Sequence, residues 1–559
     1  MLTAEAIQFE VALAPAELPA ARMDVACFIG FLKAHAEADY DTPVHARSLA
    51  ELESVFDLGA RLEKAARVDG DAIALPAPAG TLHMAVNEVL ETLDLPPAPD
   101  LASLTAAITD ADIGVIAEAN DSGGISLSLP VAAGVGTFAV LPSASYGFPT
   151  VRRAVARATP SPMALALRHY FEGGGVHAVV ISMGEPLPYD TPRSDRFAAL
   201  VHLLVREVAP NEERYAAADT LAALGLTVPL PTVGPGERTR LAHIHGLTGV
   251  TFLLAPDLTE LVAEPPTLRA VPPPALTPSG TFAECLPPPT VAGDTAQSSY
   301  TAPQCDTVGS ALWDAAVDRL VRLVSGHRRD MMVLAALPRT RSDALPPTIP
   351  RSAFLHVAAP FVVTPASRAA PERLMAPDAA LAAHLAAAAL EVGTFRSAAA
   401  RPVLGLTDVA TTPRTANAPT CRLTRVPAGF ALTQDVNTAD NPRWRDGPVA
   451  RIFCLILRQS ARVGEGIVFQ PNGPALWRDL RAAMTTLLER IRLSGALAGS
   501  GPGDSYTVAC GPETMTQADI DDGRLACDIT ITPAVPVSRI RVRLPMGSAA
   551  LSRGEGGPA

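Results

Sequence analysis

Apolar residues along the chain alternate with polar ones near both ends, and elsewhere form short β-branched runs or amphipathic segments. In both terminal segments every second residue is apolar, at Ile7, Phe9, Val11, Ile540, Val542 and Leu544. This period of two predicts a strand near each end. From about residue 160, short β-branched runs alternate with amphipathic segments. We expect strands at 25–30, 176–181, 250–254 and 331–337, and helices at 163–171, 194–206, 309–325 and 378–392. Strand–helix–strand order favours a sheet with parallel members.

The last 120 residues have the clearest periodicity. Residues 474–493 predict a helix with Pro474 in its first turn and Gly495 just beyond its end. One face of this helix is apolar, at Leu476, Leu480, Met484, Leu487, Leu488 and Ile491. Residues 448–462 predict a helix or a long buried element. Strands are expected at 466–470, 506–510, 524–532 and 539–544.

The region before residue 160 is less regular. Residues 48–66 and 83–94 favour helices. Residues 122–151 carry no charge and are long enough to span a bilayer. The segment nevertheless contains five glycines and three prolines, and Ile125, Leu127 and Leu129 alternate with serines. Strands and turns are therefore favoured over a membrane-spanning helix.

Composition narrows the class of protein. With 559 residues the chain has room for about three to four domains. Its net charge is −12, and Lys33 and Lys64 are its only lysines. An acidic chain without basic runs is a poor binder of nucleic acid and of anionic membranes. The seven cysteines include no CxxC spacing, so we expect reduced, buried thiols in a protein without a secretory signal.

Motifs for cofactor binding and nucleophilic catalysis fail at the residues their chemistry needs. Gly134, Gly136 and Ala139 fit G-x-G-x-x-A, but Pro142 blocks the helix that a dinucleotide site requires. Residues 143–147 lack the first glycine of the nucleophile elbow, which favours an ordinary loop. No catalytic residue and no cofactor are predicted.

Metal and acid–base motifs are equally incomplete. His243 and His245 would share one face of a strand, but two ligands do not make a metal site, so local packing is expected. The aspartates before Gly523 lack the spacing of a calcium loop, which favours a solvated turn. Asp257, placed after a predicted strand, would matter to an α/β enzyme only if further polar groups converged on it. No metal site is predicted.

The C-terminal region resembles the C-terminal domain of contractile tail sheath proteins, found in myophage tails and in phage-tail-like contractile injection systems. The residues that carry the resemblance are Trp444, Pro448-Val-Ala-Arg-Ile452, Ile467-Val-Phe469-Gln-Pro471-Asn472, Leu476-Trp477, Gly495-Ala-Leu497-Ala-Gly499, Tyr506-Thr-Val-Ala-Cys510, Thr516-Gln-Ala-Asp-Ile520, Gly523-Arg-Leu525 and Ile531-Thr-Pro533-Ala-Val-Pro536. Upstream segments agree in order: 26–30, 170–174 with 178–181, 250–258, 354–365 and 393–398. The last three are typical of the extracellular injection-system branch.

The chain departs from the family pattern at three places. Ser182 stands where sheath proteins often carry Arg, and Glu172 stands where Asn is frequent before the paired glycines. Residues 66–160 resemble an insertion relative to compact sheath proteins. These departures leave the general role in place and allow a sheath paralogue in place of the main sheath protein.

The resemblance implies a multidomain α+β and α/β fold, with an inner sheath domain built from N- and C-terminal parts and larger outer α/β domains inserted. The expected divisions are an arm and the start of the inner domain (1–45), an outer insertion (46–160), an outer α/β domain (161–350), a connecting part of the core (351–430), the C-terminal sheath domain with its strand arm (431–545) and a flexible tail (546–559).

The resemblance also implies function. Such a protein is a structural subunit and not an enzyme, and it polymerises as stacked, usually hexameric, rings that contract around an inner tube. Its expected partners are copies of itself, the tube protein, and baseplate and cap proteins, with no nucleic acid and no membrane insertion. Assembly in the cytoplasm into a released or anchored particle is expected. A baseplate or cap component and an α/β enzyme are the alternatives.

Two sets of residues are the candidate sites. The alternating terminal segments, at Ile7, Phe9, Val11, Ile540, Val542 and Leu544, would add as strands to the sheet of a neighbouring subunit. Pairing within their own subunit is the alternative. The second face of the 474–493 helix, with Arg478, Arg481, Glu489 and Arg492, would face the tube, and an ordinary solvated face is the alternative.

Overall fold

A computed structural model describes most of the chain, in two compact units, Met1–Gln470 and Pro471–Ala559. The described residues are 22–35, 39–64, 66–86, 89–111, 113–129, 137–155, 157–189, 191–208, 215–227, 238–266, 268–270, 298–411, 418–466, 470–521 and 523–534. Both predicted terminal strands, most of the 466–470 strand and the glycines at 134 and 136 lie outside these ranges. The fold mixes 36% helix with 24% strand, which confirms the α+β expectation.

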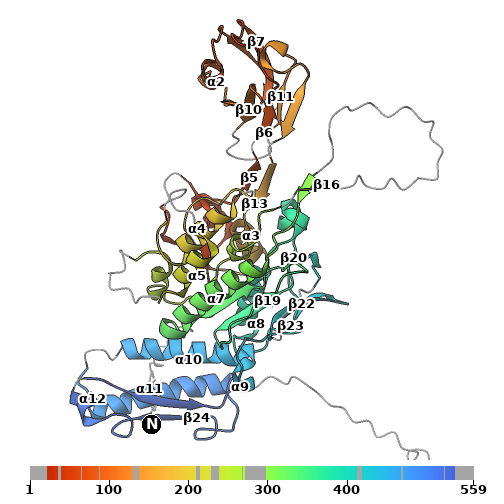
Figure 1. The fold of residues 1–559 in the computed structure, drawn as a ribbon. Coiled ribbons are helices and arrows are strands. Elements are labelled where there is room, and N and C mark those ends of the chain that lie inside the picture. The colour runs from red at the N-terminus through yellow and green to blue at the C-terminus, as the bar shows by residue number, and fades with distance from the viewer. Residues whose placement is uncertain are drawn as a thin grey trace, which may run out of the picture. The chain divides into compact units, whose positions relative to one another are not determined.

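The first unit is built around an eight-stranded sheet (Figure 1). In spatial order its strands are β23 (Gly429–Gln434), β22 (Cys421–Val426), β19 (Leu355–Ala359), β18 (Met332–Ala336), β15 (Phe252–Leu254), β1 (Ala26–Gly30), β14 (Ala178–Ser182) and β3 (Pro43–Ala46). The six central strands are parallel, and β23 and β3 pair antiparallel at the two edges. The parallel sheet predicted from the strand–helix order is therefore confirmed.

Helices cover both faces of this sheet. Strand β1 shows why, because Cys27 and Ile29 enter one apolar core while Ala26 and Phe28 enter the other. The first core includes α4 (Arg193–Leu204), α5 (Ala217–Gly225) and α7 (Thr307–His327). The second includes α3 (Pro162–Glu172), α8 (Asp378–Val392) and α10 (Gly447–Glu465). The helices expected at 163–171, 194–206, 309–325, 378–392 and 448–462 are all present.

Residues 66–155 form a lobe with an apolar core of its own. Its elements are β6 (Ala66–Asp69), β7 (Gly80–Val86), β8 (Val89–Leu95), α2 (Leu101–Thr109), β9 (Ile116–Ala119), β10 (Ile125–Leu129), β11 (Thr137–Val140) and β12 (Arg152–Val155). They make a sheet of β6, β10 and β9 and another of β12, β11, β7 and β8. The antiparallel pair β5 (Ala60–Lys64) and β13 (Arg157–Pro160) flanks the lobe in sequence. Strands within 122–151 are thus confirmed.

The helix expected at 83–94 is wrong, because β7 and β8 form an antiparallel hairpin there. Leu82 and Met84 are buried at a spacing of two, so packing in the lobe overrides the helix propensity of Met, Leu and Glu. The expected helix at 48–66 is only α1 (Leu49–Val55), since Phe56 is already extended and 60–64 pair as β5. His243 and His245 lie in a 3-10 helix and not on a strand.

The remaining elements of the first unit are short. They are β2 (Lys33–Ala34), β4 (Phe56–Asp57), η1 (Ala144–Tyr146), η3 (Arg240–His245), α6 (Leu258–Leu261), β16 (Leu268–Ala270), β17 (Ser298–Tyr300), β20 (Val362–Val363), η4 (Ala366–Ala369), η5 (Pro371–Arg373), β21 (Asp408–Val409) and α9 (Pro442–Arg445).

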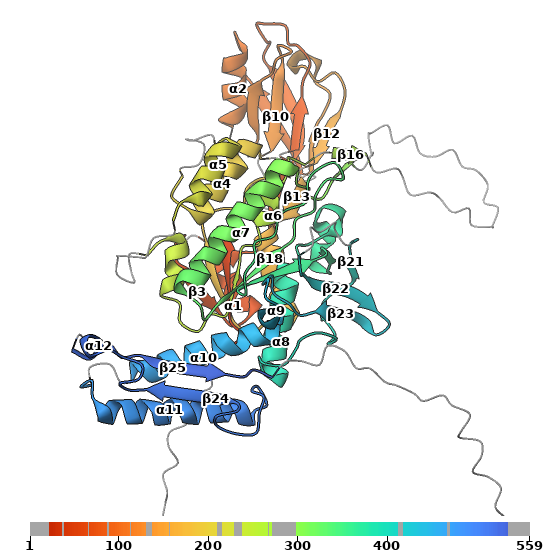
Figure 2. The same cartoon turned by 60° about the horizontal axis from the view of Figure 1, so that its bottom comes forward.

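The second unit is one long helix packed on a two-stranded antiparallel sheet (Figure 2). Its elements are α11 (Pro474–Leu493), β24 (Tyr506–Cys510), α12 (Gln517–Asp521) and β25 (Cys527–Ile531). The helix begins and ends at the predicted residues, with Pro474 at its start and Gly495 at φ +87° beyond its end. Leu476, Leu480, Met484, Leu488 and Ile491 form its buried face. The predicted strand at 506–510 is confirmed, and the strand expected at 524–532 is the shorter β25, from Cys527 to Ile531.

Candidate functional site

The hydrogen-bond pattern of β24 and β25 fixes which backbone groups face outward. The N–H of Thr532 donates to the carbonyl of Ser505, so 505 and 532 are a hydrogen-bonded pair. Antiparallel pairs alternate between hydrogen-bonded and non-hydrogen-bonded classes. With Tyr506 opposite Ile531 and no register shift, Cys527, Ile529 and Ile531 belong to the non-hydrogen-bonded class. Their N–H and C=O groups therefore point away from β24.

The outer edge of β25 is open within the described residues. There β24 and β25 pair only with each other, as a sheet of two strands. The edge of β24 is partly occupied, because Gly503 donates to the carbonyl of Tyr506 and Arg481 donates to that of Cys510. An isolated two-stranded sheet is marginally stable, and an open edge is a template for another strand. Within the described residues, the second unit therefore leaves the outer backbone edge of β25 unpaired.

The four charged residues predicted on the tube-facing side of α11 share one face of the helix, but they differ in their contacts and exposure. Arg478 is largely exposed, at 78% of its side-chain area, beside Asp479. Arg481 binds the carbonyl of Cys510 and pairs with Glu513. Glu489 pairs with Arg492 and accepts a hydrogen bond of 2.9 Å from the hydroxyl of Tyr506. Arg481 and Glu489 therefore hold α11 against the hairpin, and Arg478 is the most exposed of the four.

A buried ion pair that sequence reasoning missed lies in the first unit. Arg451 on α10 donates two hydrogen bonds to Asp435, at 2.9 and 2.6 Å, and both side chains are almost fully buried. The arginine lowers the pKa of Asp435 against the opposing effect of burial. Asp435 also accepts the backbone N–H of Ala398. The sequence signal that could have pointed to this pair is Arg451 itself, a charged residue next to the apolar positions of a predicted helix.

Arg458, two turns along α10, binds the beginnings of several parallel strands. Its guanidinium donates to the carbonyls of Val250 and Asp330, at 2.6 and 2.8 Å, and to the hydroxyl of Thr251. Burial lowers the pKa of this arginine. The side chain satisfies carbonyls that would otherwise be buried at the ends of β15 and β18. Its role is to join helix and sheet.

Asp257 lies after the carboxyl end of β15 in the same unit. It is buried and accepts the N–H of Phe31, at 2.7 Å, and of Met163 in the first turn of α3, at 3.2 Å. Burial raises its pKa to about 7. A Cβ on Gly30 would lie 2.3 Å from its Oδ2, so glycine is required there. The carboxylate therefore joins β1, α3 and the end of β15.

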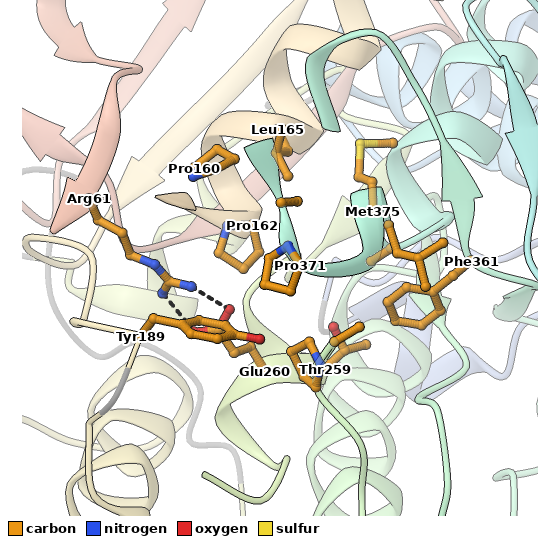
Figure 3. Close-up of a pocket in the computed structure, with 15 residues that line it drawn as sticks. Arg61, Pro160, Pro162, Leu165, Tyr189, Thr259, Glu260, Phe361, Pro371 and Met375 are labelled. Carbon is orange, nitrogen blue, oxygen red and sulfur yellow. Dashed lines mark hydrogen bonds and ion pairs between the residues drawn. The ribbon is translucent and has the colours of Figure 1, made fainter. Parts of the chain in front are cut away.

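A small cavity in the first unit is lined in part by residues of β5, α3 and α6 (Figure 3). The guanidinium of Arg61 binds both carboxylate oxygens of Glu260, at 2.6 and 2.7 Å, and lies over the ring of Tyr189. The other lining residues are mainly prolines and aliphatic side chains, including Pro162, Pro371 and Met375 of Figure 3. The cavity volume is about 40 Å³, which is room for a few water molecules. The two charges neutralise each other, so the arrangement joins β5 to α6.

The weaker sequence motifs have structural roles. Residues 143–147 form a turn around Gly147 at φ +81°. His243 contacts Asp41 at 3.2 Å, and the ring of His245 packs against that of His327. Asp519 accepts hydrogen bonds from Thr516 and pairs with Arg524. In the ranges described, no three His, Cys, Asp or Glu residues are grouped to hold a metal ion.

The described cysteines and helices bear on two further expectations. Six of the seven cysteines are described; all six are free thiols and five are buried, as predicted. Cys285 lies outside the described residues. Within the described part of the chain, no helix has the length and apolar character needed to cross a membrane.

Known structures resemble most or nearly all of this chain. A chain of the anti-feeding prophage baseplate in its contracted state aligns with a TM-score of 0.54 and 14% identity, covering 98% of this chain and 99% of that one. The anti-feeding prophage helical sheath in its contracted state aligns at 0.49 and 16%, covering 98% and 100%. The contracted sheath complex of an extracellular contractile injection system named PVC aligns at 0.43 and 17%, covering 70% and 82%. No protein-family model and no curated protein matches the sequence.

The first of these likenesses establishes a shared fold. It spans both compact units and leaves almost no residue of either chain unmatched. This chain therefore has the fold of a chain found in the contracted anti-feeding prophage baseplate.

Proposed function

We propose that this protein is a structural subunit of the contractile sheath in a phage-tail-like injection machine. The end-to-end fold shared with a chain of the anti-feeding prophage baseplate carries the proposal. The open edge of β25 supports it, because a subunit that must bind its neighbours needs such a template. The subunits would stack as rings, hexameric in our proposal, and contract to drive an inner tube through a target envelope.

The inferred arrangement places an inner sheath domain at both ends of the sequence. Residues 1–45 would supply its arm and first strand, and 431–545 its C-terminal part. Outer α/β domains, at 46–160 and 161–350, would be inserted between them, with 351–430 connecting. The separate apolar core of the 66–155 lobe supports the idea of an inserted outer domain. A domain with its own core adds mass without disturbing the packing of the inner domain.

The terminal segments would join neighbouring subunits by strand addition at β25. Either Ile7, Phe9 and Val11 or Ile540, Val542 and Leu544 would supply the added strand. Its backbone would pair with the outward N–H and C=O groups of Cys527, Ile529 and Ile531. Main-chain hydrogen bonds give such contacts strength, and alternate side chains give them specificity. A head-to-tail contact of this kind builds rings or helical arrays.

The exposed side of α11 would contact the tube, with Arg478 as the main charge. The charge is solvated, so its contribution to binding is small per contact, about 0–1 kcal/mol, and a contact of this strength can be broken on contraction. Arg481 and Glu489 would act indirectly, by holding the helix on the hairpin, and Arg492 would act through its pairing with Glu489. In this account the protein is not an enzyme and uses no cofactor, and contraction draws on energy stored in the extended assembly.

A baseplate or cap component of the same machine is the second candidate, favoured because a likeness with a TM-score of 0.54 is to a chain of a baseplate structure. Copy number separates the two. A sheath protein would be the dominant band of a purified particle, whereas a cap or baseplate protein would be present in a single ring. Quantitative gel analysis of the particle tests this.

The proposed site of assembly is the cytoplasm. The proposed partners are other copies of this protein and the tube, baseplate and cap proteins, with no binding to nucleic acid and no membrane insertion.

A further inference from the structure

Two cysteines lie directly opposite each other in the sheet of the second unit. Cys510 is the last residue of β24 and Cys527 the first of β25, and the two are paired in register. The hydrogen bond from Thr532 to Ser505 places this pair in the non-hydrogen-bonded class, as it does for Ile529 and Ile531. Opposed Cα atoms in that class are about 4.5 Å apart. Disulfides span Cα separations of about 4.4–6.8 Å, so the backbone needs no rearrangement.

Both thiols are free, and their side chains face each other on one side of the sheet, where each affects the pKa of the other. Cys510 is buried and Cys527 is partly exposed, so a small oxidant can reach the sulfur of Cys527 first. Both side chains lie on the same face of the sheet as Tyr506, which binds Glu489 of α11. The two side chains project from a face of the sheet, so neither points toward the outer backbone edge of β25.

We propose that Cys510 and Cys527 are a redox site that closes to a cross-strand disulfide with a small-molecule disulfide as oxidant. The thiolate of Cys527 attacks one sulfur of oxidised glutathione and expels one glutathione thiolate. The thiolate of Cys510 then attacks the Cys527 sulfur of the mixed disulfide and expels the second. The two protons of the protein thiols end on the two glutathione molecules, so two electrons pass from protein to oxidant.

The bond would close the loop that contains α12. That loop, from Gly511 to Ala526, is held now by hydrogen bonds such as that from Thr514 to the carbonyl of Ala526. A disulfide across it would restrict the unfolded chain and so raise the thermal midpoint of the second unit. In an exported particle this would harden the hairpin after the chain has left a reducing compartment.

Closure is expected to be slow at neutral pH. Burial raises the pKa of both thiols, that of Cys527 to about 12, while Arg481 lowers them by a smaller amount. The reactive thiolate is therefore scarce at pH 7. Far below the pKa, the thiolate fraction rises about tenfold for each pH unit, and the rate of closure should rise with it.

The test uses the full chain with oxidised glutathione at pH 8, followed by thiol counting in denaturant and peptide mapping. The expected count falls from seven to five, with one cross-linked peptide that joins Cys510 to Cys527. Cys285→Ala is the matched control and should still lose two thiols. Cys527→Ala, folded by its circular dichroism, should lose none to an internal bond. An unchanged count, a stable glutathione adduct without closure, or a cross-link at other cysteines would overturn the proposal, and none of these depends on the protein's being a sheath subunit.

Discussion

The guanidinium of Arg451 and the carboxylate of Asp435 face each other inside the first unit, joined by two hydrogen bonds of 2.9 and 2.6 Å. Arg451 comes from α10 and Asp435 follows β23, so the pair joins the last helix of this unit to an edge of its sheet. Arg451 also donates to the carbonyls of Thr394 and Arg396. Almost every polar atom of the pair is satisfied, which is what makes a buried charge tolerable.

Removing one partner of this pair should therefore unfold the first unit more easily. Arg451→Ala or Asp435→Asn leaves the other group buried without its partner, and we expect a loss of about 3–5 kcal/mol in urea unfolding. Arg67→Ala, which breaks exposed pairs with Asp69 and Glu118, should cost no more than about 1 kcal/mol. Equal effects of Arg451→Ala and Arg67→Ala would contradict the assigned role.

Asp257 should make the first unit less stable as the pH rises. Its folded pKa is raised from 3.8 to about 7, so between these values the folded state binds more protons than the unfolded state. The free energy of unfolding then falls with increasing pH, by at most about 1.4 kcal/mol per unit. Asp257→Asn should flatten this slope between pH 5 and 7, measured by urea unfolding across the range. The exposed Asp121→Asn should leave it unchanged, and an equal slope in all three proteins would refute the assignment.

Local signals in the sequence predicted the helices and parallel strands, and tertiary packing explains the failures. The bounds 378–392 and 474–493 agree with α8 and α11, because periodic apolar faces and terminal Pro and Gly residues mark them. The helix predicted at 83–94 was wrong because packing in the core of the lobe places these helix-forming residues in a hairpin. On α11, the sequence could not show that Glu489 accepts a hydrogen bond from Tyr506, because Tyr506 belongs to a different element, β24. The partner of Arg451 lies 16 positions away on another element, so periodicity could not identify it.

A proline at the open edge of β25 should block assembly without unfolding the hairpin. Ile529→Pro removes an N–H that faces outward, so the ladder to β24 stays intact. We expect a folded protein that forms no polymer by analytical ultracentrifugation. Ile529→Ala removes similar apolar packing but keeps the N–H, and it should still polymerise. Thr530→Pro breaks a pair that faces β24 and should unfold the second unit. Polymer formed by Ile529→Pro would exclude β25 as the edge that receives an arm.

Charge reversal at Arg478 should weaken tube binding and leave folding alone. The side chain is 78% exposed and pairs only loosely with Asp479, at 3.5 Å, so Arg478→Glu should change the unfolding free energy by less than about 0.5 kcal/mol. Co-purification with the tube protein should decrease and become less sensitive to salt. Arg490→Glu alters an exposed arginine about 120° around the same helix and is the matched control. An equal loss of binding in both variants would exclude a specific contact at Arg478.

The most direct test of the sheath proposal is negative-stain electron microscopy of the recombinant protein, alone and co-expressed with its tube protein. We predict hollow, cogwheel-like tubes from the full chain, and a soluble protein without tubes when residues 1–13 are deleted. Normal tubes from the truncated chain would contradict strand addition by the N-terminal arm. A full chain that stays monomeric even in the presence of the tube protein would contradict the proposal that it is a sheath subunit.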